Sequence, residues 1–279
     1  MTYSLLLFDD ESTRTWEPFA LTRPVGELLF GALLLRERAE RFWSCPCEGH
    51  LTHSSLRGFS EPGAPPTVEP SALSAQTHRI LQSSRAALSG PVPALPSGPA
   101  TLVLRGQVVG WALPPGVPDP PPELLGVPDK LPESETVGVE GILLSGPWDL
   151  MAENSRQLLE DIPGLFPGYA ADDVPGCHIV GDGLLSLGSG VELEPGSVFD
   201  VRNGPIRLED GVVIRSHSRI EGPAFVGRDS VLLGGCFGSI SVGPVCKVRG
   251  EVESSVILGF SNKAHDGFLG HSYLGRWVN

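Results

Sequence analysis

The stretch LEDGVVIRSHSRIEGPAFVGRDSVL, residues 208–232, repeats a six-residue pattern without interruption. Each repeat begins with an aliphatic residue, at Leu208, Ile214, Ile220, Val226 and Leu232. An antiparallel sheet would instead show alternation with period two, interrupted by hairpin turns. A fixed short repeat is typical of a solenoid, in which each hexad forms one face of a coil and points its aliphatic residue toward the axis. The pattern predicts a left-handed parallel β-helix of hexapeptide repeats, an exception to the usual right-handed crossover.

The same repeat continues on both sides of this stretch. Its other aliphatic or aromatic positions are Leu187, Leu193, Phe199, Val242, Val248, Phe268 and Leu274. Four residues after each hexad start, the side chain is small in eleven of twelve cases, and Asn203 is the exception. A tight corner of the coil accounts for this preference, because only a small side chain fits there. Cys236 and Cys246 occupy two such corners, so we interpret them as packing residues rather than nucleophiles.

The N-terminal half has the pattern of a small α/β unit. Strands are predicted over Leu5–Phe8, Leu102–Val109 and Ile142–Leu144, and helices over Val25–Phe42 and Trp148–Ile162, the last ending at Pro163. We therefore predict an α/β domain over residues 1–165 and the β-helix over residues 176–279.

Composition excludes several classes of function. The net charge of −13 argues against a broad nucleic-acid-binding face. No segment approaches the roughly 18 apolar residues that a membrane span needs, and residues 1–8 lack the basic flank of a signal peptide. We expect a cytoplasmic protein with reduced thiols. Cys45, Cys47, His50 and His53 lie close together in the sequence, but their spacing matches no common zinc signature, so no metal site is predicted.

A polar segment, SNKAHDGFLGH at residues 261–271, interrupts the aliphatic repeat. Loops that break a repeat are places where such scaffolds carry function. His265 can accept a proton from an amine at neutral pH, as acyl transfer from a thioester requires, and Lys263 can hold a phosphate as a point charge. The alternative is that His265 only caps a turn.

Residues 261–279, SNKAHDGFLGHSYLGRWVN, resemble the acetyltransferase active-site region of the bifunctional UDP-N-acetylglucosamine pyrophosphorylase/glucosamine-1-phosphate acetyltransferase. They are more similar still to a bacterial branch of sugar nucleotidyltransferases with the same two-part layout. The resemblance implies that His265 is the catalytic base and that Asn279 lies near the acetyl donor. It also implies substrate-binding roles for Asn262 and Lys263. Phe268 stands where the bifunctional enzyme usually has a tyrosine, so one hydroxyl is missing.

The resemblance extends to the N-terminus. Residues 12–24, STRTWEPFALTRP, are similar to the nucleotidyltransferase signature, and the same branch has the F-D-D…L-T-R-P form found here. Pro147-Trp148-Asp149-Leu150 with Asn154 also looks like that branch. The resemblance implies a reduced, Rossmann-like nucleotidyltransferase domain in which Arg14 and Arg23 bind phosphates.

Taken together, the resemblance implies transfer of a nucleotidyl or acetyl group to a hexosamine 1-phosphate, as in UDP-N-acetylglucosamine synthesis. It implies UTP or another nucleoside triphosphate, a sugar phosphate and acetyl-CoA as ligands, Mg²⁺ as cofactor and a homotrimer as the assembly.

Two departures favour a different class, a non-catalytic or partner-completed β-helix scaffold. Asp9, Asp10 and Glu11 replace the glycine-rich turn that normally cradles a triphosphate. The sequence also stops at Asn279, where the family continues with further coils, so we expect a C-terminally truncated β-helix domain. Nothing in the sequence identifies the sugar, the base or the acyl chain.

Overall fold

The structure is a computed structural model that describes residues 3–69, 76–167 and 174–279. Contacts divide the chain into two compact units. The first comprises Met1–Leu28 and Leu33–Gly146, and the second comprises Leu29–Ala32 and Pro147–Asn279. Residues 147–165 therefore group with the solenoid, whereas the sequence analysis placed them in the α/β domain. In the described ranges, no helix combines the length and hydropathy that crossing a bilayer requires.

The first unit is built on a mixed sheet with strand order β4-β1-β5-β8-β7-β9. Its strands are β1 (Tyr3–Phe8), β4 (Cys47–Leu51), β5 (His78–Ser83), β7 (Ala100–Leu104), β8 (Gln107–Leu113) and β9 (Glu135–Gly138). Strands β1, β4 and β5 run parallel, whereas β5, β8 and β7 pair antiparallel. A short ladder pairs β6 (Ala86–Ser89) with β10 (Glu140–Leu143).

Alternation along β1 explains how the sheet has a core on each face. Leu5 and Leu7 pack with Phe42 of α1 (Leu35–Trp43), whereas Leu6 and Phe8 pack with Trp111. Successive side chains of a strand point to opposite faces, so an uninterrupted apolar run is what a strand covered on both sides requires. The predicted strand over Leu5–Phe8 is confirmed.

Two predicted elements of this unit are wrong in extent. Val25–Phe42 does not form one helix, because a 3₁₀ turn (η3, Val25–Glu27) and extended residues precede α1. Leu28, Leu29 and Ala32 are buried although they are not helical, so their burial in the folded protein imitates helical spacing there. Leu102–Val109 is not one strand but a hairpin, since Arg105 and Gly106 both have positive φ, as a tight turn between β7 and β8 requires.

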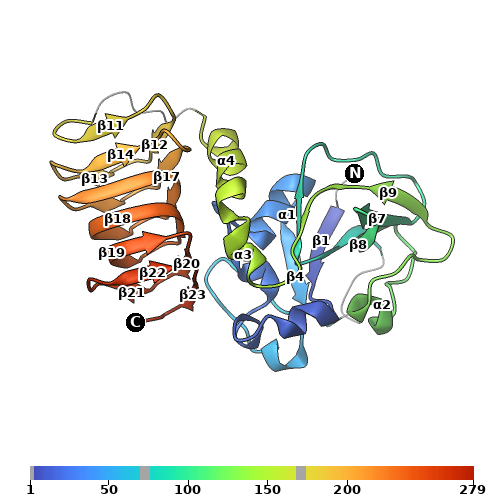
Figure 1. Cartoon of the computed structure of the whole chain (residues 1–279). Coiled ribbons are helices and arrows are strands. Elements are labelled where there is room, and N and C mark those ends of the chain that lie inside the picture. Colours follow the sequence, from blue (N-terminus) through green and yellow to red (C-terminus); the bar gives the residue numbers. More distant parts are fainter. Residues whose placement is uncertain (1–2, 70–75, 168–173) are drawn as a thin grey trace. The chain divides into compact units, whose positions relative to one another are not determined.

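The second unit contains a parallel β-solenoid of about six turns in residues 178–276, consistent with the predicted left-handed β-helix. Figure 1 shows its strands stacked from β11 to β23. They are β11 (His178–Val180), β12 (Leu185–Leu187), β13 (Glu192–Leu193), β14 (Val198–Asp200), β15 (Ile206–Leu208), β16 (Val213–Ile214), β17 (Ser218–Val226), β18 (Val231–Val242), β19 (Lys247–Glu253), β20 (Val256–Gly259), β21 (Asn262–Lys263), β22 (Phe268–Gly270) and β23 (Tyr273–Arg276).

The strand register stacks the inward residues in three columns. One column contains Leu187, Leu208, Val226, Val242, Ile257 and Leu274, each paired with the next coil. A second contains Leu193, Ile214, Leu232 and Val248, and a third contains Phe199, Ile220, Phe237, Val252 and Leu269. These side chains form one continuous apolar core, as the hexad pattern predicts.

The hexad phase fails at two places. Phe268, predicted to point inward, is 63% exposed, and Leu269 pairs with inward Val252 instead. The face from Leu269 to Leu274 spans five residues instead of six, so counting a hexad back from Leu274 reaches Phe268 and misses the inward residue by one. Cys246 is buried at its predicted corner, but Cys236 is exposed, so the packing role predicted for Cys236 is wrong.

Two helices precede the solenoid in the second unit, α3 (Asp149–Ala152) and α4 (Asn154–Leu165). The helix predicted over Trp148–Ile162 is therefore split at Glu153. Pro163 does not end α4 as predicted, because α4 continues to Leu165. Leu158 and Ile162 of α4 pack against Phe225 of the solenoid and thereby hold this last turn in place.

Residues 29–32 are fixed within the second unit by polar side chains. Gly31 N donates to Asn154 Oδ1 at 3.0 Å, and Ala32 N donates to Asp161 Oδ2 at 2.9 Å. Leu29 N donates to Tyr273 Oη at 2.8 Å. The backbone of this segment is thus bound by side chains from α4 and from the solenoid.

Candidate functional site

The carboxyl ends of the three parallel strands meet at one edge of the sheet in the first unit. Asp9 and Asp10 follow β1, Thr52 and His53 follow β4, and Arg85 lies two residues after β5. In open α/β sheets, ligands bind at the carboxyl ends of strands. This edge is the candidate site of the first unit.

Asp10 organises the loop that follows β1. It is 2% exposed, receives Thr13 N at 3.2 Å and forms an ion pair with Arg85 Nε at 2.7 Å. These contacts cap the 3₁₀ helix η1 (Glu11–Thr15), and they neutralise the charge of the carboxylate. Three adjacent acids, Asp9, Asp10 and Glu11, would be expected to repel phosphates. Because Asp10 is paired with Arg85, its own contribution to this repulsion is small.

Asp9 turns inward at the same edge. Its Oδ2 accepts Thr52 Oγ1 at 2.6 Å, whereas its buried Oδ1 has no hydrogen-bond partner among the described residues. Burial raises the pKa of Asp9, although hydrogen bonds from Thr52 and Ser84 and the nearby His50 oppose this shift. An orphaned carboxylate oxygen at this edge could serve as a single protein ligand to Mg²⁺, an ion that usually takes its other ligands from substrate phosphates and water. Among the residues that the structure describes, no group of three or more His, Cys, Asp and Glu side chains is arranged to hold a metal ion.

Arg14 is the exposed cation of this edge. Its Nε donates to His53 Nε2 at 3.0 Å, which orients the guanidinium, and the residue is exposed. Arg23 has a different environment, because it is 6% exposed and its Nη1 pairs with Glu61 Oε2 at 2.9 Å. Of the two arginines predicted to bind phosphates, Arg14 has the more accessible position.

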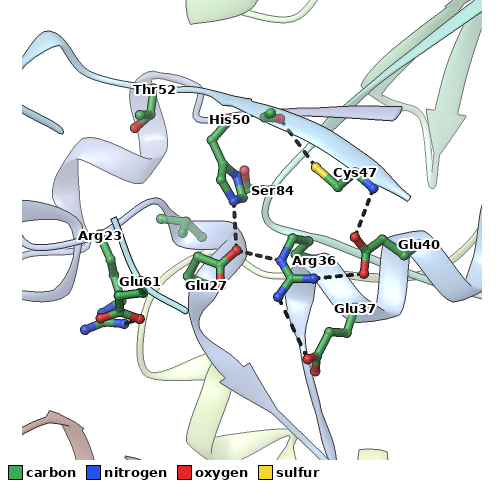
Figure 2. Close-up of polar contacts among 12 residues, drawn as sticks. Arg23, Glu27, Arg36, Glu37, Glu40, Cys47, His50, Thr52, Glu61 and Ser84 are labelled. Carbon is green, nitrogen blue, oxygen red and sulfur yellow. Dashed lines mark hydrogen bonds and ion pairs between the residues drawn. The ribbon is translucent and has the colours of Figure 1, made fainter. Parts of the chain in front are cut away.

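A buried ionic network lies behind the edge (Figure 2). Glu27 Oε1 accepts Arg36 Nε at 2.6 Å and His50 Nε2 at 2.8 Å, and Arg36 Nη1 pairs with Glu40 Oε2 at 2.9 Å. Burial raises the pKa of Glu27, but the hydrogen bonds from His50 and Arg36 outweigh it, so this pKa lies below its usual value. Gly26 packs on His50, since an added Cβ would lie 2.8 Å from ring atom Cε1.

The cysteines and histidines of residues 45–53 do not converge. His50 binds Glu27, His53 binds Arg14, and Cys47 Sγ donates to Gly49 O at 3.4 Å. Burial raises the pKa of the Cys45 thiol to about 11 and that of the Cys47 thiol to about 12.

The second unit brings the predicted C-terminal residues together on neighbouring coils. Asn262 Nδ2 donates to Asn279 Oδ1 at 2.9 Å. Lys263 Nζ donates to the carbonyl oxygens of Arg249 and His265, both at 2.8 Å, and of Gly267 at 3.2 Å. These contacts match the three N–H donors of an ammonium group, so Lys263 would have to release a carbonyl to bind phosphate. The side chain of His265 is exposed.

Sequence reasoning missed Thr52, His53 and Arg85 as members of the candidate site. Each comes just after the end of β4 or β5, two parallel strands that the sequence analysis did not predict, and recognising those strands would have indicated these residues. Their meeting with Asp9 and Asp10 depends on strand order, which periodicity does not reveal.

The sequence of residues 5–168 matches a family model described as sugar nucleotidyl transferase, and this match covers more than half of the chain. No curated protein matches the chain. The matched range contains the whole strand edge described above.

Proposed function

Because the chain belongs to the sugar nucleotidyl transferase family, we propose that its first unit transfers a nucleotidyl group from UTP or another nucleoside triphosphate to a hexosamine 1-phosphate. A phosphate oxygen of the sugar phosphate attacks the α-phosphorus. The bond from the α-phosphorus to the bridging oxygen of the β-phosphate breaks, and pyrophosphate leaves.

The observation that supports this proposal is the arrangement of side chains at the carboxyl ends of β1, β4 and β5, which lie within residues 5–168, the range matched by the family model. Arg14 is accessible there and is oriented by His53, and Asp10 is neutralised by Arg85. A guanidinium offers paired N–H donors that suit phosphate oxygens. Arg14 would bind the triphosphate and stabilise the charge of the leaving pyrophosphate, and Asp9 would hold the Mg²⁺ ion that shields the phosphates from each other.

Release of pyrophosphate tests the proposal, using the full chain with UTP, Mg²⁺ and glucosamine 1-phosphate or N-acetylglucosamine 1-phosphate. Arg14→Gln should lower kcat/KM at least tenfold, since a charge-assisted hydrogen bond contributes roughly 1.5–3 kcal/mol. Arg57→Gln is the matched control, because Arg57 is an exposed arginine of the same unit that pairs with Glu69. Absence of pyrophosphate with any nucleoside triphosphate would contradict the proposal and favour the scaffold alternative.

A second activity, acetyl transfer from acetyl-CoA to the amine of the same sugar phosphate, is favoured by the last coils. They contain the four residues for which the resemblance implies roles in this activity. His265 is the implied base, Lys263 and Asn262 the implied substrate-binding residues, and Asn279 the implied residue near the acetyl donor. His265 would accept the proton of the attacking amine, the new N–C bond would form, and the thioester C–S bond would break to release CoA.

Release of free CoA thiol measures this second activity. His265→Ala should abolish it, whereas His271→Ala, which changes another exposed histidine of the same coils, should leave it unchanged. Equal rates for the wild type and His265→Ala would remove His265 from this role.

A further inference from the structure

A cleft of about 490 Å³ opens on the outer surface of the solenoid. Its walls include Arg215, His217, Leu233, Gly234, Arg249 and Asp266. This volume is in the range of small-molecule sites. All of these residues belong to the second unit, so the cleft shares no residue with the strand edge that carries the proposed nucleotidyl transfer.

The register of the coils explains why two arginines face this cleft. Inward residues Ile214, Leu232 and Val248 pair in succession, so the residues that follow them, Arg215, Leu233 and Arg249, lie on the outer face of three successive coils. Neighbouring strands are about 4.8 Å apart, so the two arginine backbones are separated by roughly 10 Å. Side chains of this length can reach a single ligand above Leu233.

Each guanidinium is oriented by a partner. Arg215 Nη1 pairs with Glu194 Oε1 at 2.5 Å, and Arg249 Nε pairs with Asp266 Oδ1 at 2.8 Å. Arg249 Nη1 also donates to Leu233 O at 2.9 Å. A guanidinium has five N–H donors, and these contacts use one on Arg215 and two on Arg249. Both side chains are therefore held in place while they keep donors for a ligand.

The floor of the cleft and the donors on its walls suit a compact anion. Gly234 and Gly235 have φ of 105° and 131°, and a Cβ at Gly235 would lie 2.0 Å from Gly250 O, so bare backbone is required there. Each arginine is balanced by a carboxylate, Arg215 by Glu194 and Arg249 by Asp266, so it is the remaining N–H donors of the two guanidinium groups, and not a net charge, that suit an anion.

We propose that this cleft binds the phosphate group of a small phosphorylated molecule, with Arg215 and Arg249 as its cationic ligands and His217 as a further hydrogen-bond partner. Paired guanidinium N–H groups match the oxygens of phosphate better than they match any neutral group. The proposal does not depend on nucleotidyl transfer, since it involves only residues of the solenoid.

Calorimetric titration of the full chain with inorganic phosphate and with glucose 1-phosphate, at low salt, tests it. Arg215→Gln and Arg249→Gln should each weaken binding about tenfold or more, and added salt should weaken binding to the wild type. Arg228→Gln is the control, because Arg228 is 63% exposed on the same solenoid, pairs with Asp229 and does not line the cleft. Its affinity should equal that of the wild type.

The two ligands distinguish what the cleft recognises. Equal affinities would show that it binds phosphate alone, and tighter binding of glucose 1-phosphate would show that it also contacts the sugar; both outcomes support the proposal. Arg215→Lys and Arg249→Lys keep the charge but lose the planar guanidinium group, so they should bind with intermediate affinity. They also show whether weaker binding by the glutamine variants comes from the lost donors or from a folding defect.

Three results would overturn the proposal. The first is no binding of either ligand to the wild type up to about 10 mM. The second is unchanged binding by a folded Arg215→Gln/Arg249→Gln double variant. The third is a change in sedimentation coefficient of the variants without phosphate, because it would assign the two arginines to a protein contact.

Discussion

Glu27 is a carboxylate whose protonation is coupled to folding. It is 2% exposed, and its pKa lies below the ordinary value of 4.5 because His50 and Arg36 stabilise the charged form more than burial destabilises it. When the pH falls, the unfolded chain binds this proton first. The stability that Glu27 contributes is therefore complete above about pH 4.5, and it is lost as the pH falls through the pKa of the folded state.

We expect Glu27→Gln to lower the free energy of unfolding by about 1–3 kcal/mol at neutral pH, since it removes the charge from two buried hydrogen bonds. The difference from the wild type should shrink as the pH decreases below 4.5. Urea unfolding of both proteins between about pH 3 and 7 measures this difference. A constant difference over the whole range would contradict the assigned direction of the pKa shift.

The sequence motif predicted some residues of the candidate site and missed others. The T-R…L-T-R-P pattern indicated Arg14 and Arg23 as equals, yet Arg23 is buried against Glu61 whereas Arg14 is exposed. Sequence alone does not show that Arg85 neutralises Asp10, because these residues are 75 positions apart and meet only through the pairing of β1 with β5.

At the scale of elements, segment 29–32 depends on acceptors from α4. Asp161 accepts Ala32 N with one oxygen and Gln157 Nε2 with the other, at 2.9 and 2.8 Å. We expect Asp161→Ala to lower the free energy of unfolding by about 1–3 kcal/mol, because it leaves a buried backbone N–H without an acceptor.

Asp161→Asn is the control for this prediction, since its amide oxygen can still accept from Ala32 N. It should retain most of the stability in chemical denaturation. Equal loss in both variants would show that charge, and not the hydrogen bond to the segment, is what Asp161 supplies.

The elements also show how far periodicity predicts the fold. The hexads from Leu208 to Leu232 correctly predict the coils in which each face has six residues. Prediction fails for Phe237 and Leu269, because the faces from Leu232 to Phe237 and from Leu269 to Leu274 have five residues instead of six. A repeat pattern cannot indicate a change in face length, which only backbone pairing between coils reveals.

At the scale of the whole molecule, we propose a homotrimer, as the resemblance implies, in which exposed apolar side chains of the solenoid would lie at contacts between chains. Phe268 is 63% exposed and Val245 is 43% exposed. We expect sedimentation equilibrium to give the mass of three chains of 29.6 kDa.

Phe268→Glu combined with Val245→Glu should shift that equilibrium toward the single chain, because charges at an apolar contact lose their solvation. The paired control, Val127→Glu, places a charge on an exposed valine of the first unit and should leave the mass unchanged. A wild type that sediments as a single chain at all concentrations would contradict the expectation.

The backbone ladders of the solenoid also determine how it would respond to mechanical force. Its backbone hydrogen bonds run along the axis of the stack, and they connect each coil only to the coils next to it. A load applied along the axis would therefore peel away one coil at a time, at modest force and in separate steps. A load applied along the strands would have to shear many of these bonds at once, so the same structure is compliant in one direction and stiff in the other.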